Sequence, residues 1–178
     1  MTKILGSRHS FVDADDEKAV EFINIACDIV SIPEYQKMKD MIQHHATSRY
    51  QHCLNVAWYS YLMSKKAHLD YVSCTRGAML HDFYLYDRHT DIPLPGRHCA
   101  VHPRVALMNA EKYFELNPTE IDVILHHMWP NGTAKPETEE GMVVQAADKY
   151  CAFLEFTSHA VLTVPHLVSH AYHILTAD

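Results

Sequence analysis

Histidine stands out in this sequence, with 15 copies among 178 residues. Its imidazole serves mainly as a metal ligand, a proton carrier or a pH sensor. Two copies are adjacent, His126 and His127 in the stretch ILHHMWPNG, and adjacent helix positions point about 100° apart. Packing one apolar stripe would not need both, so we expect the pair either to bind a ligand or to be exposed.

Imidazole and carboxylate side chains recur in four other apolar contexts. A His-Asp pair occurs in AMLHDF, single histidines occur in RYQHCLNVA and AVHPRVA, and an aspartate occurs in AADKY. These groups suit iron, manganese or zinc, and the whole set is too large for one tetrahedral ion. It is about right for two ions: His52, His81, Asp82, His102, His126, His127 and Asp148.

The flanking sequence predicts that these residues lie in or beside helices. Asp15 and Asp16 precede an apolar repeat of helical period that ends before Pro33, and a short helix is expected after this proline. Ser48 can cap a helix from residue 49 to about residue 67, in which the histidine of RYQHCLNVA points inward.

The middle of the chain alternates between helix and loop signals. Asp70 can cap the segment YVSCTRGAMLHDF, which carries the His-Asp pair on one face. The following DRHTDIPLPGRH breaks the helical period and predicts a loop. A further helix is expected to start at Pro103, directly after His102, and to run to about Glu115.

The last part of the chain has the clearest helix boundaries. Asn117 with Glu120 three residues later predicts a capping box, and Pro130 disfavours helical geometry just before it. The adjacent histidines therefore fall in the last turn of that helix. Thr138 opens another helix, and Pro165 is expected to begin the final one.

No alternating β-branched run and no glycine-marked hairpin interrupts these segments. We therefore expect an all-α fold of the helical-bundle kind. A chain of 178 residues can bury most of its surface in one core, and no linker or repeat divides it. Residues 1–178 are accordingly predicted to form a single domain.

In order, spacing and helical context, the five histidine and aspartate segments resemble the HD superfamily of metal-dependent phosphohydrolases. The signature of that family is a histidine, a His-Asp pair, further histidines and a final aspartate. The resemblance covers about residues 48–155, with helical extensions on both sides. The chain is most similar to the two-metal branch, and within it to bacterial HD hydrolases that split diadenosine tetraphosphate symmetrically and typically bind iron.

This resemblance implies two metal sites that share one carboxylate. The first ion would be held by His52, His81, Asp82 and Asp148, and the second by Asp82 with His102, His126 and His127. A helix that ends at Trp-Pro could present two successive imidazoles to one ion. Two ions about 3.5–4 Å apart can hold a bridging hydroxide that attacks phosphorus. The expected cofactor is two divalent or mixed-valent ions, iron in the first place, with manganese or zinc as alternatives.

Further residues are predicted to contact the substrate. Arg49 lies one helical turn before the first histidine, and its planar fork could bind two phosphate oxygens. Lys149 directly follows the final aspartate, and Arg97 and His98 lie in the loop. Tyr84, next to the His-Asp pair, could stack on a nucleobase. With the bridging aspartate, Arg49 and Lys149 form the predicted catalytic set.

The predicted function is hydrolysis of a phosphate ester or anhydride bond in a nucleotide or a related small phosphate compound. One alternative is a di-iron oxygenase of the HD type; such relatives generally have one histidine fewer, so having both His126 and His127 favours hydrolysis. The other is a non-catalytic sensor of metal or nucleotide. The stretch MWPNG differs from the threonine-glycine pattern expected after the histidine pair of the tetraphosphate hydrolases.

Charge and hydropathy limit the classes of binding partner that we expect. A net charge of -7 leaves no broad basic face for a nucleic-acid polymer. No stretch of 18 apolar residues and no signal peptide occurs, so we expect a cytoplasmic protein without a membrane partner. The sequence does not indicate an oligomeric state. His166, His170 and His173 share a helical face and are interpreted as a surface stripe, with a further metal site as the alternative.

Overall fold

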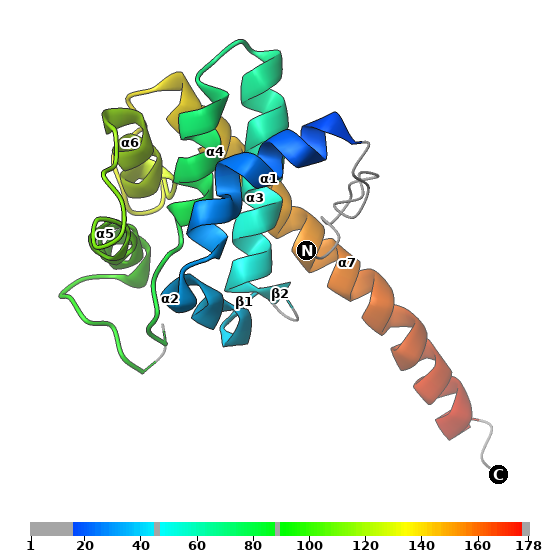
Figure 1. Ribbon diagram of the computed structural model, residues 1–178. Coiled ribbons are helices and arrows are strands. Elements are labelled where there is room, and N and C mark those ends of the chain that lie inside the picture. The colour runs from blue at the N-terminus through cyan, green and yellow to red at the C-terminus, as the bar shows by residue number, and fades with distance from the viewer. Residues whose placement is uncertain (1–15, 45–46, 88–89, 176–178) are drawn as a thin grey trace.

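A computed structural model describes residues 16–44, 47–87 and 90–175 (Figure 1), and for residues 44 and 159–175 it describes the backbone alone. The elements in chain order are α1 (Glu17–Val30), α2 (Pro33–Gln36), the 3₁₀ helix η1 (Lys37–Asp40), β1 (Ile42–His44), β2 (Thr47–Ser48), α3 (Arg49–Lys66), α4 (Tyr71–Leu80), α5 (His98–Ala110), α6 (Pro118–His126) and α7 (Glu139–Leu175). The prediction of an all-α fold is confirmed, since β1 and β2 are the only strands of these ranges.

The predicted capping residues start the helices. The side chains of Asp16, Ser48, Asp70 and Asn117 each accept a hydrogen bond from a backbone N–H in the first turn of α1, α3, α4 and α6. Such a cap contributes about 1 kcal/mol to helix stability. The capping box of α6 is complete, because the side chain of Glu120 also accepts from the Asn117 N–H at 2.9 Å. Asp15 lies outside the described residues.

Two predicted helix starts were wrong. α5 begins at His98 rather than at Pro103. Its N-cap is Arg97, whose carbonyl oxygen accepts hydrogen bonds from the backbone N–H groups of Ala100 at 2.9 Å and of Val101 at 3.1 Å. The proline removes one donor but does not end the helix. Pro165 likewise begins no new helix, since α7 runs without interruption from Glu139 to Leu175. The side chains of the predicted histidine stripe at the end of α7 lie outside the described residues.

A short hairpin was not predicted. β1 and β2 pair antiparallel, with Ile42 opposite Ser48, and the Arg49 N–H continues the pairing to Met41 O at 2.7 Å. With three and two residues, the strands are too short to show a period of two in the sequence. The hairpin brings residues 41–44 back over the first turn of α3.

The helices pack around α3. This helix contacts α4 and α7 most extensively, and α6 packs on α4, α5 and α7. Gly77 makes the contact between α4 and α6 possible, because a Cβ atom there would lie 2.8 Å from Val123 Cβ. Figure 1 shows α5 and α6 together on one side of the central helices, while α7 runs past α3 and extends away from the other helices. α4 thus packs against α3 on one side and against α6 on the other.

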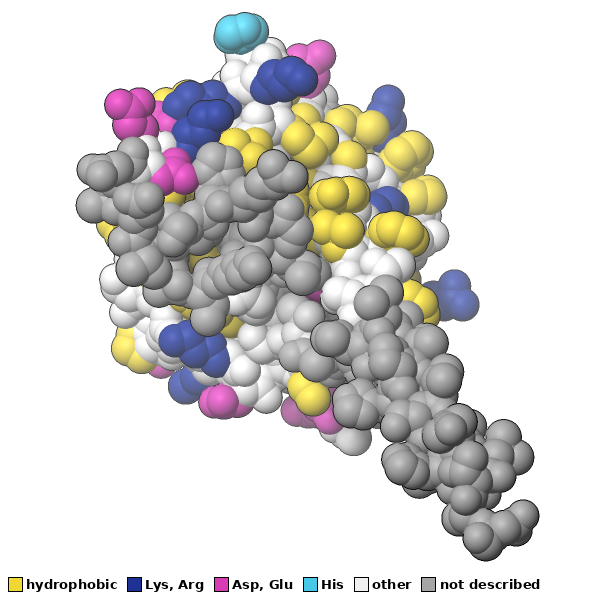
Figure 2. Space-filling model, turned by 90° about the vertical axis from the view of Figure 1, so that its right-hand side faces the viewer, with side chains coloured by type: hydrophobic (Ala, Val, Ile, Leu, Met, Phe, Trp, Pro, Cys, Tyr) yellow, Lys and Arg dark blue, Asp and Glu magenta, His cyan; other side chains and the backbone are white. Residues whose placement is uncertain are grey.

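The surface is mixed. Figure 2 shows hydrophobic side chains gathered on one part of the surface. Among the exposed apolar residues are Met63 of α3 and Tyr150 and Phe153 of α7. Exposed apolar side chains are common on proteins. No helix in the ranges given above combines the length and hydropathy needed to cross a membrane. The residues that could take part in a reaction lie inside the bundle instead, where His52, His81 and Asp82 are buried.

Candidate metal centre

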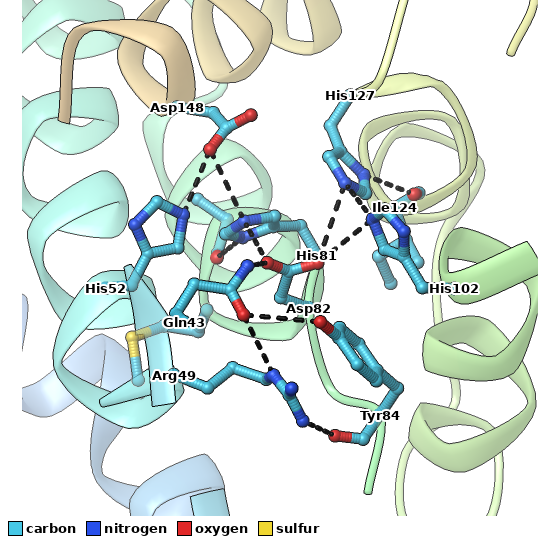
Figure 3. A network of polar contacts seen from close by, with 12 residues as sticks. Gln43, Arg49, His52, His81, Asp82, Tyr84, His102, Ile124, His127 and Asp148 are labelled. Atoms are coloured by element: carbon cyan, nitrogen blue, oxygen red, sulfur yellow. Dashed lines mark hydrogen bonds and ion pairs between the residues drawn. The ribbon is translucent and has the colours of Figure 1, made fainter. Parts of the chain in front are cut away.

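Histidine and aspartate side chains from five helices converge in the core (Figure 3). They form two groups of three in which the potential ligand atoms lie within 4.8 Å of one another, and the groups share one histidine. We call them the Asp148 group (His52, His81 and Asp148) and the Asp82 group (His81, Asp82 and His127, to which His102 is added below).

The Asp148 group joins α3, the end of α4 and α7. His52 Nε2 lies 3.0 Å from Asp148 Oδ1, and His81 Nε2 lies 3.9 Å from the same oxygen. His81 directly follows α4 and keeps helical backbone angles, so the helix carries its ring into the core. One carboxylate oxygen therefore faces two imidazole nitrogens from different helices.

The Asp82 group joins the end of α4 to α5 and the end of α6. His102 Nε2 lies 3.1 Å from Asp82 Oδ1 and 2.9 Å from His127 Nε2, which places His102 in this group. His127 Nε2 lies 3.7 Å from the same Oδ1. The other carboxylate oxygen, Oδ2, lies 3.5 Å from His81 Nε2. The two oxygens of Asp82 thus face different histidines.

All four imidazoles present the same nitrogen to the cluster. Each Nδ1 faces an acceptor away from it: His52 faces Glu155, His81 faces Ala78 O, His102 faces His98 O and His127 faces Ile124 O. Carbonyl and carboxylate oxygens only accept, so each Nδ1 must carry a proton. Each Nε2 is then left for a ligand, which is the arrangement that outer hydrogen bonds impose on metal-binding histidines.

Several inward-facing atoms lack a suitable partner within the protein. His81 Nε2 is buried without a hydrogen bond to any described residue, and Asp82 Oδ1 accepts no well-oriented one despite its close imidazoles. His102 Nε2 and His127 Nε2 are 2.9 Å apart although both rings already donate through Nδ1, so a proton or a cation must separate their lone pairs. These unsatisfied lone pairs fit bound metal ions.

A buried carboxylate supports the Asp148 group from behind. Glu155 has a side chain that is 0% exposed, lies 3.0 Å from His52 Nδ1 and accepts from Asn55 Nδ2 at 2.8 Å. Sequence reasoning did not assign it a role. The available signal was its spacing, because seven residues after Asp148 is the same face of α7 two turns on.

The surroundings drive the imidazole pKa values apart. Burial opposes protonation of His52, but hydrogen bonds to Asp148 and Glu155 raise its pKa to about 10. Burial and the nearby rings of His81 and His102 lower the pKa of His127 to about 3. Without metal, the Asp148 group therefore contains an imidazolium between two carboxylates, whereas His127 in the Asp82 group is neutral.

The two aspartates remain ionised. Burial alone would raise the pKa of Asp82, but electrostatic interaction with the nearby imidazoles of His81 and His102 holds it well below its ordinary value. Burial likewise opposes ionisation of Asp148, and the hydrogen bond from His52 outweighs it, so the pKa of Asp148 is also lowered. Both carboxylates are thus available as anionic ligands near neutral pH.

Residues 49–152, more than half of the 178-residue chain, match the HD domain family. The chain belongs to the HD domain family. This membership supports a metal-dependent enzyme of the phosphohydrolase kind that binds divalent ions. No protein of curated annotation and no solved structure shows a significant match to the chain.

In this HD domain, six of the seven residues predicted as metal ligands come together, but His126 does not join them. Its Nδ1 lies 2.6 Å from Asp122 Oδ1, and Asp122 also accepts the backbone N–H groups of Glu137 and Thr138. Adjacent side chains stay about 100° apart because His127 keeps helical backbone angles. The expectation that both imidazoles of the pair face one ion is therefore not met.

Arg49 and Tyr84 are both buried and contact each other. The Arg49 side chain is buried, donates to Tyr84 O at 2.6 Å and lies 3.5 Å above the centre of the Tyr84 ring. Tyr84 is itself fully buried, so its ring offers no face to a nucleobase. An inward-pointing arginine was not expected from the sequence, because long basic side chains usually lie in solvent.

A cleft of about 240 Å³ opens beside the Asp82 group. Its lining includes Lys149 and His98, both predicted, and Gln43 and Asn131, which sequence reasoning missed. Lys149 Nζ donates to Trp129 O at 2.8 Å. Arg97 is exposed ahead of α5 and is not among the lining residues. The cleft gives the buried cluster an opening to solvent with one cationic side chain at its wall.

Proposed function

We propose that this HD domain is a two-metal phosphohydrolase that cleaves a phosphate ester or anhydride bond of a nucleotide or a related small phosphate compound. The observation that supports two ions is the shape of the cluster. Two groups of potential ligands share His81, and the two oxygens of Asp82 face different imidazoles. We infer that Asp82 bridges the ions, with His52, His81 and Asp148 on one side and His102 and His127 on the other.

The ions would supply Lewis-acid chemistry and an activated water. The protein would orient the ligands of the ions and contact the phosphate. Outer hydrogen bonds fix the imidazole rings, so their Nε2 atoms are held ready without reorganisation. Lys149 can turn from Trp129 O to a phosphate oxygen, and the Asn131 amide and the His98 ring line the same cleft. Buried side chains surround the cluster, and the cleft would give substrate and water access to it.

The size of the cleft bears on the substrate. About 240 Å³ is below the roughly 300–1,000 Å³ of pockets that enclose a whole small molecule. We therefore expect it to bind the phosphoryl end while the remainder of the substrate lies outside. A nucleotide or a diadenosine polyphosphate satisfies this requirement as well as a smaller phosphate ester does.

Phosphate release tests the proposal. Protein loaded with iron or manganese is expected to release phosphate or nucleotide from a panel that includes diadenosine tetraphosphate. Asp82→Ala should lose activity and metal together, because it removes the shared carboxylate. His126→Gln is the matched control, since His126 bonds to Asp122 outside the cluster. Turnover that survives in Asp82→Ala would contradict the assignment.

A di-iron oxygenase is the second candidate, and the position of His126 favours it. With His126 turned to Asp122, an ion held by Asp82, His102 and His127 would have one nitrogen ligand fewer than the sequence suggested. An ion held there would keep a coordination position open for substrate. Oxygen consumption by the iron-loaded protein with a polyol or a phosphonate, without phosphate release from any nucleotide, would establish the oxygenase instead.

A further inference from the structure

The missed residue Gln43 contacts the central carboxylate of the cluster directly. It lies in β1 with 9% of its surface exposed, and its Nε2 donates to Asp82 Oδ2 at 2.5 Å. Figure 3 shows its amide reaching towards Asp82 from the hairpin side. Among the hairpin side chains that the structure describes, it is the one that lines the cleft.

The orientation of this amide is fixed by its other end. Gln43 Oε1 accepts from Arg49 Nε at 3.0 Å and from Tyr84 OH at 3.3 Å. An arginine has donors only, so the amide oxygen must face Arg49 and the NH₂ group must face Asp82. A flipped amide would set its NH₂ group against the guanidinium and its oxygen against the carboxylate.

Arg49 is anchored in turn to the segment that carries Asp82. Its guanidinium donates to Tyr84 O at 2.6 Å and stacks on the Tyr84 ring, and Tyr84 N donates to Asp82 O at 2.8 Å. The hairpin, the first turn of α3 and the turn after α4 are therefore tied together by one chain of polar contacts. This accounts for an arginine that is buried rather than exposed to substrate.

The contact from Gln43 restricts how Asp82 can use its lone pairs. Each carboxylate oxygen has two, and on Oδ2 one is taken by Gln43, which leaves one on the side of His81. Oδ1 faces His102 and His127. The carboxylate is thereby held with one oxygen towards each half of the cluster. A freely rotating carboxylate could instead chelate a single ion with both oxygens.

We propose that Gln43 is a positioning residue that holds Asp82 in the bridging orientation, and that Arg49 acts through Gln43 by fixing its amide. The inference rests on the proposed function only in requiring two bridged ions, and it does not depend on which bond is cleaved. It replaces the predicted role of Arg49 as a phosphate contact. Its test therefore measures the ions rather than turnover.

The decisive variant is Gln43→Leu, which keeps the size of the side chain and removes the amide. The matched control is Gln36→Leu, because Gln36 is a partly buried glutamine whose Nε2 donates to Val30 O, outside the cluster. Manganese binding is measured by titration and elemental analysis, and electron paramagnetic resonance reports whether two manganese ions are coupled through a bridge. Thermal unfolding of the metal-free variants measures the purely structural cost.

Gln43→Leu is expected to weaken binding of the second manganese ion by about 10- to 100-fold and to lose the coupled signal, as loss of an outer partner does in other metal sites. Gln36→Leu should keep both ions and the signal at a similar loss of stability. A coupled pair of normal affinity in Gln43→Leu would overturn the inference, and so would a wild-type protein that binds only one ion. A wild type with two coupled ions but no hydrolysis would defeat the proposed function alone.

A double-mutant cycle tests the part assigned to Arg49. If Arg49 acts only through Gln43, Arg49→Met weakens manganese binding by less than Gln43→Leu does. The double variant then loses no more manganese affinity than Gln43→Leu alone does. Strictly additive losses in manganese affinity would overturn the relay from Arg49 to Gln43.

Discussion

The two halves of the cluster use the same kinds of ligand but differ in what stands behind them. In the Asp148 group, His52 is backed by the buried carboxylate of Glu155. In the Asp82 group, His102 and His127 are backed by neutral backbone carbonyls, and Asp82 is held by the neutral amide of Gln43. A carboxylate behind an imidazole makes it more basic, whereas a carbonyl mainly orients it.

This difference separates the two sites electrostatically before any metal binds. The pKa of His52 is raised to about 10, so an incoming ion must displace a proton there. The pKa of His127 is lowered to about 3, so its Nε2 is already free. We therefore expect the Asp148 group to release a proton when it binds metal, while His127 releases none. The two sites should differ in the pH dependence of metal binding.

The largest expected effect on metal binding comes from a substitution that removes a ligand from one half of the cluster and leaves the other half intact. His127→Gln removes a nitrogen from the Asp82 group, while His52, His81 and Asp148 keep their contacts. The variant should bind one ion per chain and lose hydrolysis. His126→Gln, one residue away, should bind two ions and keep activity within about twofold, because the His126 side chain contacts Asp122 rather than the cluster.

Elemental analysis of the two purified variants side by side checks this prediction. Both replace a histidine with an amide of similar size, so they differ only in the direction of the side chain. If the two variants lost metal equally, the separation of His126 from the cluster would be contradicted, and the pair would bind one ion as the sequence suggested.

These same residues show how much of the site could be predicted from the sequence. The order of histidines and aspartates identified the family, since capped helices with clear periods bring them to one place. The direction of His126 could not be predicted, because it depends on whether the backbone leaves the helix before or after His127. Here the helical angles persist through that residue.

The hydrogen-bond partners behind the cluster residues could not be predicted from the sequence, for a different reason. Gln43 reaches Asp82 across 39 positions, and Glu155 reaches His52 across 103. Neither contact has a local signal, because the first depends on a hairpin of two very short strands and the second on the packing of α7 against α3. Helix periodicity shows which face is buried but not what the facing element supplies.

A smaller effect is expected from removing the charge behind His52. Glu155→Gln keeps an acceptor for His52 Nδ1 but removes the negative charge, so it should weaken metal binding at the Asp148 group by about 10- to 100-fold. The Asp82 group should be little affected. Calorimetric titration with manganese resolves the two steps. Glu139→Gln, at the exposed start of the same helix, is the control, and an equal loss in both variants would count against a specific role of Glu155.

The last effect needs no metal at all and concerns the stability of the fold. Because the pKa of His52 is raised from 6.5 to about 10, protonation of His52 stabilises the metal-free protein fully below about pH 6.5. That contribution is lost as the pH rises towards 10. The pKa of His127 is lowered from 6.5 to about 3, so this residue makes the fold lose stability as the pH falls towards 3.

Urea unfolding of the chelator-treated protein at a series of pH values separates the two contributions. Wild type should lose stability between about pH 7 and pH 10, and His52→Gln should show a flatter dependence over that range because its group cannot titrate. On the acidic side both proteins should lose stability as His127 becomes protonated. His52→Gln should differ from wild type there because it lacks the hydrogen bond that lowers the pKa of Asp148. An alkaline slope that persists unchanged in His52→Gln would mean that the charge of the Asp148 group does not reside on His52, and the electrostatic distinction between the two halves would then fail.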